Sequence, residues 1–207
     1  MAIGIINYGM GNIASIKNAF EALGADTFLV ETPEMLKDAE RIILPGVGAF
    51  SAAMQHLNEE KWIPAIQHAV YEQKRPLLGI CLGMQLLLTS GDEGGTCAGL
   101  GLIDGEVKHL QLSDPALRIP HMGWNEVDYT AESPLFKGIP DQSDFYFVHS
   151  YAAVTKSDDD VIARTQYGGD FVVAIARDHV FGVQFHPEKS STAGRKLLQN
   201  FLEYMPC

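Results

Sequence analysis

The sequence is poor in basic residues and in cysteine. Among its 207 residues, 15 Lys and Arg are set against 26 Asp and Glu, which gives a formal net charge of −11. An acidic surface repels phosphate backbones and anionic lipid heads, and no stretch alternates Lys or Arg with aromatic residues, so we expect neither nucleic acid nor membrane as a partner. The three cysteines, Cys81, Cys97 and Cys207, follow no CxxC pattern, and their odd number does not suggest a disulfide framework. A reducing cytoplasm is therefore the expected setting.

Long hydrophobic runs are also missing. The N-terminus lacks the basic lead and the cleavage site of a signal peptide, and the most apolar stretch, residues 76–88, is interrupted by Gly79, Gly83 and Gln85. That stretch is also too short to cross a bilayer. No internal repeat, low-complexity segment or Pro/Ser-rich linker marks a boundary. The length suits one full core, so we expect a single domain over residues 1–207.

The first half alternates between patterns typical of strands and patterns typical of helices. Short apolar runs predict strands, and apolar residues recurring every three or four positions predict helices. The expected strands are residues 2–7, 27–30, 41–44 and 76–80, and the expected helices are residues 13–23, 33–38, 49–57, 63–72 and 82–89. Asn12 is expected to cap the first helix and Gly24 to end it. Such alternation indicates a parallel sheet covered by helices on both faces.

The second half is richer in strands. Turn residues separate strands expected at residues 101–110, 126–129, 144–153, 161–166, 171–177 and 180–185. Their close spacing predicts antiparallel strands added to the parallel sheet, and Ser190 or Ser191 can cap a last helix ending near Tyr204. The expected fold is therefore α/β, with an open mixed sheet that is mainly parallel. Active groups in such folds lie at the carboxyl ends of the strands.

One strand-to-helix junction carries a cysteine between two glycines. Residues 79–83 have the G-x-nucleophile-x-G form of a nucleophile elbow. The turn is sharp, so a side chain at Gly79 or Gly83 would clash, and Cys81 is raised to the start of a helix whose positive end favours a thiolate. The N–H of Leu82 can donate to an oxyanion. The alternative for Cys81 is a buried structural cysteine, which the flanking glycines make less favoured.

A histidine with a nearby carboxylate follows another apolar strand. A thiolate needs a partner that takes and returns a proton near neutral pH, and histidine is the usual one. His186 follows residues 180–185, Pro187 keeps it out of the helical region, and Glu188 comes two positions later. In extended chain these two side chains project to the same side, so Glu188 can orient the ring. The alternative is an ordinary surface turn.

A glycine-rich loop follows the third expected strand. Residues 45–49 contain Gly46 and Gly48, which permit unusual backbone angles and let main-chain N–H groups face a pocket. If the third and fourth strands are neighbours, this loop lies beside Cys81 and can supply a second oxyanion donor. The alternative is a simple strand-to-helix turn.

Taken together, residues 79–85 and 186–188 resemble the triad, or class I, glutamine amidotransferases, and the match covers essentially the whole chain. Further segments resemble, more narrowly, the glutaminase subunits of imidazole glycerol phosphate synthases. These segments are residues 7–12, 45–48, 120–125, 145–151 and 186–190. At the triad the sequence does not depart from the family pattern.

The resemblance implies a mechanism. Cys81 attacks the side-chain amide of glutamine, His186 protonates the leaving ammonia and later activates water, and Glu188 orients His186. The N–H groups of Val47 and Leu82 match the oxyanion donors, and a flip of the peptide between Gly46 and Val47 would explain low activity without a partner. Residues that match glutamine-binding positions are Gly48, Gln85, His149, Ser150 and Tyr151. The resemblance implies neither a cofactor nor a metal.

The resemblance also implies a partner. Ammonia passes to a separate (β/α)8 cyclase subunit, with which the family forms a heterodimer that makes imidazole glycerol phosphate for histidine biosynthesis. Positions that match the interface are Asn12, Trp124, Tyr146 and Lys189. An acidic subunit is a poor binder of a doubly phosphorylated ribotide, so a partner should bind it. Trp and Tyr are also the residue types that anchor interfaces.

Other interpretations stay open at this point. Residues 9–14 fit the G-x-G-x-x-A pattern of dinucleotide-binding turns, and Glu31 lies twenty residues beyond Gly11. The chain could also serve a different synthase, such as that of anthranilate, carbamoyl phosphate or pyridoxal phosphate. A cysteine peptidase or a catalytically silent binding module is the remaining alternative.

Overall fold

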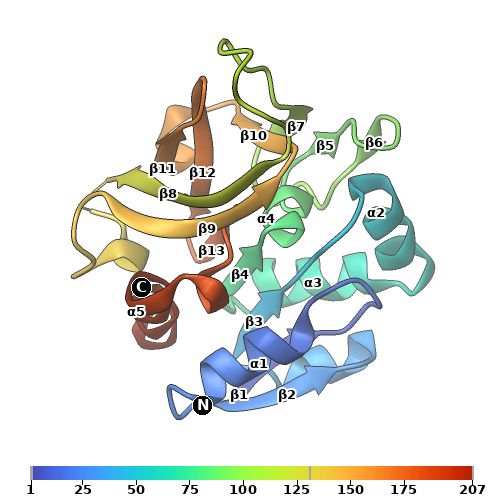
Figure 1. The fold of residues 1–207 in the computed structure, drawn as a ribbon. Coiled ribbons are helices and arrows are strands. Elements are labelled where there is room, and N and C mark those ends of the chain that lie inside the picture. Colours follow the sequence, from blue (N-terminus) through green and yellow to red (C-terminus); the bar gives the residue numbers. More distant parts are fainter. Residues whose placement is uncertain (1, 131, 207) are drawn as a thin grey trace.

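The structure is a computed structural model that describes residues 2–130 and 132–206. Its parallel strands form one half of the sheet, in the order β2 (Asp26–Val30), β1 (Ala2–Ile6), β3 (Arg41–Leu44), β4 (Leu77–Ile80) and β13 (Val180–Val183). Every residue of β3, β4 and β13 is buried. Strands that read as continuous apolar runs belong in the middle of a sheet covered on both faces, which is where these three lie (Figure 1).

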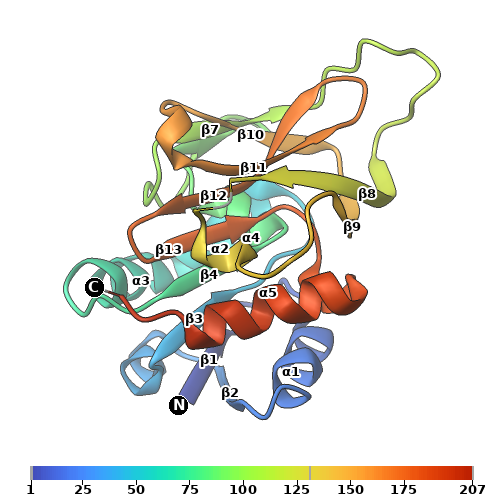
Figure 2. The same cartoon turned by 90° about the vertical axis from the view of Figure 1, so that its left-hand side faces the viewer.

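Helices cover the two faces of the parallel half. One core cluster joins the sheet to α2 (Phe50–Glu59), α3 (Trp62–Tyr71) and the short α4 (Leu82–Leu86). A second cluster joins the other face to α1 (Ile13–Glu21) and α5 (Ser191–Glu203), which lie on the side that faces the viewer in Figure 2. The longer helices α1, α2, α3 and α5 each bury an apolar stripe with a spacing of three or four residues. The expected α/β fold with a mixed sheet and helices on both faces is confirmed.

Beyond β13 most neighbouring strands of the sheet pair antiparallel. From β13 the sheet continues through β12 (Asp170–Arg177), β10 (Tyr151–Thr155) and β7 (Gly105–His109) to the two-residue strands β5 (Ser90–Gly91) and β6 (Cys97–Ala98). Off this path, β11 (Val161–Gln166) pairs with β12 and with β8 (His121–Tyr129), and β8 pairs with β9 (Ser143–His149). Short 3-10 helices are η1 (Pro33–Asp38), η2 (Pro134–Phe136), η3 (Asp158–Asp160) and η4 (Pro187–Lys189).

Several expected elements differ in detail. The strand expected over residues 144–153 is broken at Ser150, because β9 pairs only with β8 whereas β10 crosses to β7 and β12. The strand expected at 101–110 is limited to β7, and the one expected at 126–129 begins five residues earlier, at His121. The strands β5 and β6 have no counterpart among the expected elements. Hydrophobic periodicity reports burial, not the pairing partner, and so misses such breaks and short edge strands.

The two predicted N-caps have the expected positions but lack the expected capping hydrogen bonds. Asn12 occupies the N-cap position of α1, and Ser190 that of α5, but neither side chain makes a capping hydrogen bond. The Ser190 hydroxyl instead donates to the His186 carbonyl at 2.6 Å and accepts the Tyr146 N–H at 3.0 Å. It therefore holds the segment that carries His186 against β9. Within residues 2–130 and 132–206, no helix combines the length and the apolar character needed to cross a bilayer.

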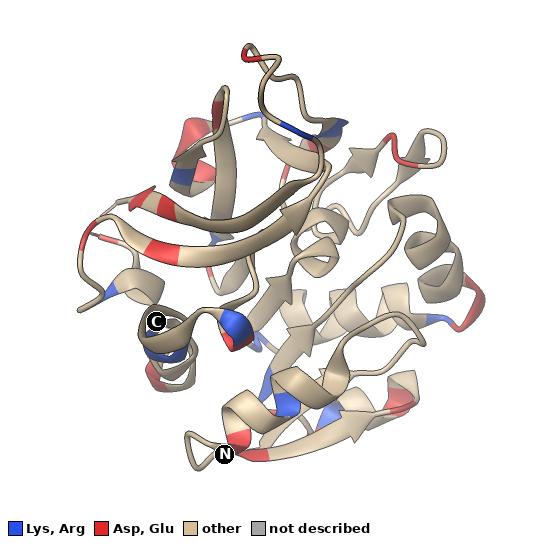
Figure 3. Ribbon diagram, viewed as in Figure 1, with Lys and Arg blue, Asp and Glu red and all other residues tan. Residues whose placement is uncertain are grey.

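Charged residues are distributed over much of the fold. Figure 3 shows acidic positions on turns and strands in both halves of the molecule, not confined to one element. This distribution agrees with the net charge of −11 and gives the molecule a generally negative surface.

Candidate active site

Three functional segments follow three neighbouring parallel strands. β4 pairs with β3 on one side and with β13 on the other, and all three run in the same direction. The glycine-rich loop after β3, Cys81 after β4 and His186 after β13 therefore meet at one edge of the sheet. The expected adjacency of the third and fourth strands is confirmed.

Cys81 sits in a strained turn between β4 and α4. Its backbone angles are φ 57° and ψ −114°, a region that a residue with a side chain rarely adopts. The Cys81 N–H donates to the Val183 carbonyl at 2.8 Å, which ties the turn to β13. The side chain is buried but reaches a cavity at the sheet edge. Strain of this kind at a strand-to-helix turn is typical of a nucleophile elbow.

The glycines around Cys81 are required by close backbone packing. A Cβ added to Gly79 would lie 2.6 Å from the Gly83 carbonyl oxygen, and one added to Gly83 would lie 1.9 Å from the Leu44 carbonyl oxygen. A Cβ on Gly46 would lie 2.9 Å from the Gly83 nitrogen. Because no side chain fits at these contacts, the turn and the loop after β3 can pack directly against each other.

His186 is fixed by its backbone and by Glu188. Its N–H donates to the Tyr146 carbonyl at 2.9 Å, and its backbone is extended, with φ −100° and ψ 94°, as expected for a residue before proline. Its Nδ1 lies 2.8 Å from Oε1 of Glu188. The backbone conformation expected for Glu188 was wrong, however. Glu188 reaches the ring from the 3-10 turn η4 and not from an extended segment.

The electrostatics favour a protonated His186. Burial lowers the pKa of His186, but hydrogen bonds and charge interactions with Cys81 and Glu188 outweigh burial and raise the pKa to about 9. The ring therefore lies between the thiol and the carboxylate and carries a proton near neutral pH. A thiolate and an imidazolium in contact form the reactive pair of cysteine nucleophiles.

A cavity of about 320 Å³ opens beside these groups. That volume is within the usual range for a small-molecule site. The structure brings to this cavity all the predicted oxyanion and glutamine-binding residues. Its lining consists of Val47, Gly48, Cys81, Leu82, Gln85, Glu93, Pro120, Val148, His149, Ser150, Tyr151 and His186. Of the predicted triad, Glu188 does not line the cavity, because its side chain is fully buried and contacts His186.

Sequence reasoning missed Glu93 and Gln184. Glu93 lines the cavity, and its carboxylate accepts the Phe50 N–H at 3.0 Å. Burial raises the pKa of Glu93, and the Phe50 hydrogen bond opposes that rise. The available signal was a pair of acidic residues, Asp92 and Glu93, bounded by Gly91 and Gly94. Gln184 is fully buried, with its Nε2 3.9 Å from the Cys81 sulfur, and gave no pattern of its own.

Three of the four predicted interface residues gather on one surface. The Trp124 and Tyr146 rings meet edge to face at 5.9 Å, and Nζ of Lys189 lies 5.6 Å from the centre of the Tyr146 ring. Trp124 is 53% exposed, and Met122 on the same face of β8 is 61% exposed. Asn12, at the start of α1, is partly exposed and belongs to a separate element. We call Met122, Trp124, Tyr146 and Lys189 the aromatic face.

The G-x-G-x-x-A segment lies between β1 and α1, as the dinucleotide interpretation requires. A Cβ on Gly11 would lie 3.0 Å from a ring carbon of Pro45, so this turn packs against the loop after β3. In the structure Gly11 therefore allows close packing against Pro45. This packing gives a physical reason for the glycine that does not depend on a bound dinucleotide.

Comparisons with known proteins agree with this geometry. The family model "Glutamine amidotransferase class-I" matches residues 4–205. The chain is 50% identical over 200 residues to imidazole glycerol phosphate synthase subunit HisH 1 of Campylobacter jejuni strain RM1221, covering 97% of this chain and 98% of that protein. It is 48% identical over 204 residues to subunit HisH of Sulfurimonas denitrificans, covering 98% of both.

Solved structures show the same fold at low sequence identity. The structure of PurLQS from Thermotoga maritima matches with a TM-score of 0.76 and 22% identity, covering 98% of both chains. A glutamine amidotransferase from the same organism matches with a TM-score of 0.66 and 15% identity, covering 98% of this chain and 81% of that one. With the family model and the close relatives, the chain is shown to belong to the class-I glutamine amidotransferase family.

Proposed function

We propose that this chain is the glutaminase subunit of an imidazole glycerol phosphate synthase. It hydrolyses glutamine to glutamate and ammonia and delivers the ammonia to a cyclase subunit in histidine biosynthesis. The observation that carries the proposal is the contact of Cys81, His186 and Glu188 beside a cavity of about 320 Å³. Identity near 50% over almost the whole chain to proteins named as such subunits supports the choice of synthase.

The reaction proceeds by acyl transfer to sulfur. The Cys81 thiolate attacks the amide carbon of glutamine, and the resulting oxyanion is held by the N–H groups of Val47 and Leu82. His186 gives its proton to the amide nitrogen, the C–N bond breaks, and ammonia leaves from a thioester. His186 then takes a proton from water, which attacks the thioester and releases glutamate and the thiolate. Glu188 keeps Nδ1 protonated, so that Nε2 faces the reaction.

Binding of glutamine is assigned to the groups that line the cavity. Gln85, Gly48 and the segment 149–151 hold the substrate. The carboxylate of Glu93 is suited to the α-ammonium group, because an ion pair with a positive charge offsets the cost of burying the carboxylate. This assignment leaves the thiol and the oxyanion donors for the side-chain amide.

The partner is a (β/α)8 cyclase that forms a heterodimer with this chain. The aromatic face presents exposed Trp124 and Met122 beside the Lys189–Tyr146 contact, and exposed aromatic residues of this type anchor interfaces. Asn12 contributes from the start of α1. The negative surface of this chain favours binding of the phosphorylated ribotide by the partner. The whole chain is one domain, and it works in the cytoplasm.

A glutaminase assay with and without a candidate cyclase and its ribotide tests the proposal. Cys81→Ala and His186→Ala are expected to lower glutamine-dependent synthesis by about 10⁴-fold or more, because the nucleophile or its proton carrier is lost. Synthesis from free ammonium should continue, since it bypasses this site. Full glutaminase activity in Cys81→Ala would refute the mechanism, and co-purification with a non-cyclase synthase would refute the assignment to this pathway.

A further inference from the structure

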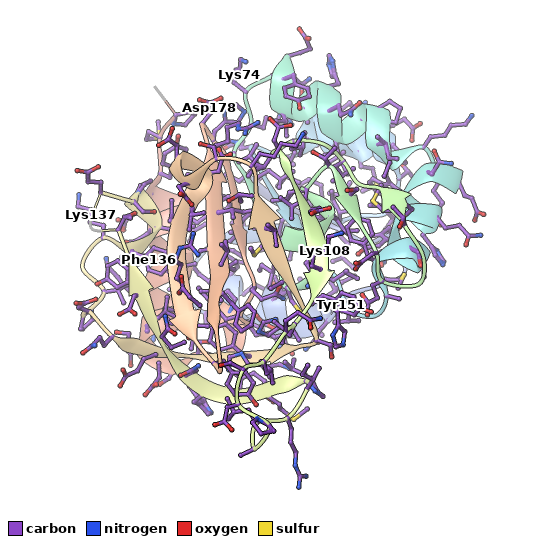
Figure 4. The ribbon with its side chains drawn as sticks, turned by 90° about the horizontal axis from the view of Figure 1, so that it is seen from above. Lys74, Lys108, Phe136, Lys137, Tyr151 and Asp178 are labelled. Atoms are coloured by element: carbon purple, nitrogen blue, oxygen red, sulfur yellow. The ribbon has the colours of Figure 1, made fainter. Side chains whose placement is uncertain are left out.

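A single main-chain carbonyl organises the polar groups behind the cavity. The Tyr151 oxygen lies 2.8 Å from Nδ1 of His149 and 3.2 Å from Nε2 of Gln85. Tyr151 opens β10, beside the strand that carries Lys108, as the view in Figure 4 shows. A carbonyl oxygen can only accept hydrogen bonds, so both side chains must donate to it. This requirement fixes the amide of Gln85 and the tautomer of His149.

One chain of hydrogen bonds runs from the Tyr151 carbonyl through Gln85 and Gln184 to Cys81. With its NH₂ group at the Tyr151 carbonyl, Gln85 also donates to Oε1 of Gln184 at 2.9 Å. The oxygen of Gln184 is thereby turned toward Gln85, and its NH₂ group is turned toward Cys81. Nε2 of Gln184 lies 3.9 Å from the Cys81 sulfur, within reach of an N–H···S hydrogen bond. The Gln184 side chain is fully buried.

A second chain of hydrogen bonds runs from the Tyr151 carbonyl through His149 and His121 to Asn125. Since Nδ1 of His149 donates, its Nε2 accepts from Nδ1 of His121 at 2.9 Å, and Nε2 of His121 faces the Asn125 amide at 3.3 Å. The His121 ring is stacked between the rings of Phe147 and Tyr167, at 4.7 and 3.9 Å. Burial lowers the pKa of both histidines to about 4, so the order of donors and acceptors persists at neutral pH.

We propose that Gln184 is a further catalytic residue, whose side-chain N–H donates to the Cys81 sulfur in an orientation fixed by Gln85. The proposal rests on the role of Cys81 as the nucleophile. The sulfur carries negative charge before attack and again when the thioester is hydrolysed, and a fixed donor stabilises it at both points. An amide does not titrate, so it stabilises the charge without competing with His186 for the proton.

Two substitutions distinguish the effect of the Gln184 N–H donor from the effect of Gln184 packing. Gln184→Met removes both polar atoms at a similar volume, and Gln184→Glu keeps an acceptor for Gln85 while removing the amide donor. In the complex with the cyclase, both are expected to lower kcat for glutamine hydrolysis and the rate of Cys81 alkylation by iodoacetamide by about tenfold. KM should change less in Gln184→Glu, because the contact with Gln85, which is assigned to glutamine binding, is retained there.

Asn200→Leu serves as the matched control. Asn200 is also buried, and its amide donates to the Leu135 and Lys137 carbonyls, each at 2.8 Å, outside the cavity. Its loss should lower the melting temperature and leave the alkylation rate of the folded protein unchanged. A purely structural role for Gln184 would produce the same pattern in its variants.

The outcomes distinguish this inference from the proposed function. If Gln184→Met and Gln184→Glu react with iodoacetamide and glutamine as the parent does, while Cys81→Ala is inactive, only the role of Gln184 is overturned. If Cys81→Ala retains hydrolysis, the proposed function fails as well. Should Gln184→Met not fold, Gln184→Glu decides the question, because the Gln85 contact is preserved in it.

Discussion

The carboxylate of Glu188 contacts the ring of His186. Its Oε1 lies 2.8 Å from Nδ1 of the ring, and its Oε2 is buried without a hydrogen-bond partner among the described residues. The charge of the carboxylate therefore acts mainly on one neighbour. That interaction helps to raise the pKa of His186 to about 9 against the effect of burial. Glu188 thus sets both the direction and the protonation of the ring that contacts Cys81.

Glu188→Gln is expected to lower kcat by roughly 10- to 100-fold, the equivalent of one hydrogen bond to a charged group. The neutral amide can still accept from Nδ1, so the loss should be milder than in His186→Ala. Without the negative charge the pKa of His186 falls, so the alkaline loss of activity should begin at lower pH than in the parent. Glutaminase activity measured against pH checks both effects. An unchanged alkaline limb, with Glu203→Gln as the surface control, would contradict them.

Glu93→Gln is expected to raise KM for glutamine by about tenfold with a smaller effect on kcat. Removing the charge would remove the proposed ion pair with the α-ammonium group and leave the reacting groups in place. Asp92→Asn is a close control, because Asp92 is the preceding residue and pairs with Lys108. Steady-state kinetics with the cyclase present give both constants. A loss confined to kcat would mean that Glu93 does not bind the ground-state substrate.

The sequence is most informative where one local pattern serves one physical need. The Gly79–Cys81–Gly83 turn could be predicted because the sharp corner leaves no room for side chains, and the distances bear this out. The His-Pro-Glu segment could be predicted because proline restricts the residue before it. The alternation of the first half likewise predicted four of the five parallel strands, whereas β13 was expected among the antiparallel strands and instead pairs in parallel with β4. In each case the cause lies within a few residues of its effect.

The remaining features depend on partners distant in the chain. The break at Ser150 follows from which strands β9 and β10 pair with. The Ser190 hydroxyl does not cap α5, because it bonds to the His186 carbonyl and the Tyr146 N–H instead. The roles of Gln184 and Glu93 could not be predicted, because they depend on contacts that only the fold creates. Gln184 contacts Cys81 and Gln85, and Glu93 contacts Phe50. Such contacts have no periodic signature in the sequence.

Gly83→Ala is expected to lower the melting temperature and to abolish glutamine hydrolysis. The new Cβ would lie 1.9 Å from the Leu44 carbonyl oxygen, so β3 and the turn at Cys81 must separate. A forced shift of this kind costs roughly 2 kcal/mol or more, which corresponds to a fall of about 4–8 °C. Gly24→Ala is the contrast, because its φ of +77° causes strain but its Cβ would meet no atom within 4 Å. Calorimetry and hydrolysis assays should show a loss of activity only at Gly83.

Lys189→Ala is expected to weaken coupling to the cyclase more than isolated hydrolysis. Nζ of Lys189 lies 5.6 Å from the centre of the Tyr146 ring, and the ring of Tyr146 meets that of Trp124 at 5.9 Å. Lys189 also follows Glu188 directly, so binding of the proposed partner at the aromatic face would act on the turn that carries Glu188. Removing a cation–π contact of this kind should reduce the stimulation of hydrolysis by the ribotide-loaded cyclase by roughly threefold to tenfold. The same assay on Lys156→Ala, an exposed lysine outside the aromatic face, should show normal stimulation. Equal losses with and without the cyclase in Lys189→Ala would show that the residue supports the active site alone and has no role in coupling.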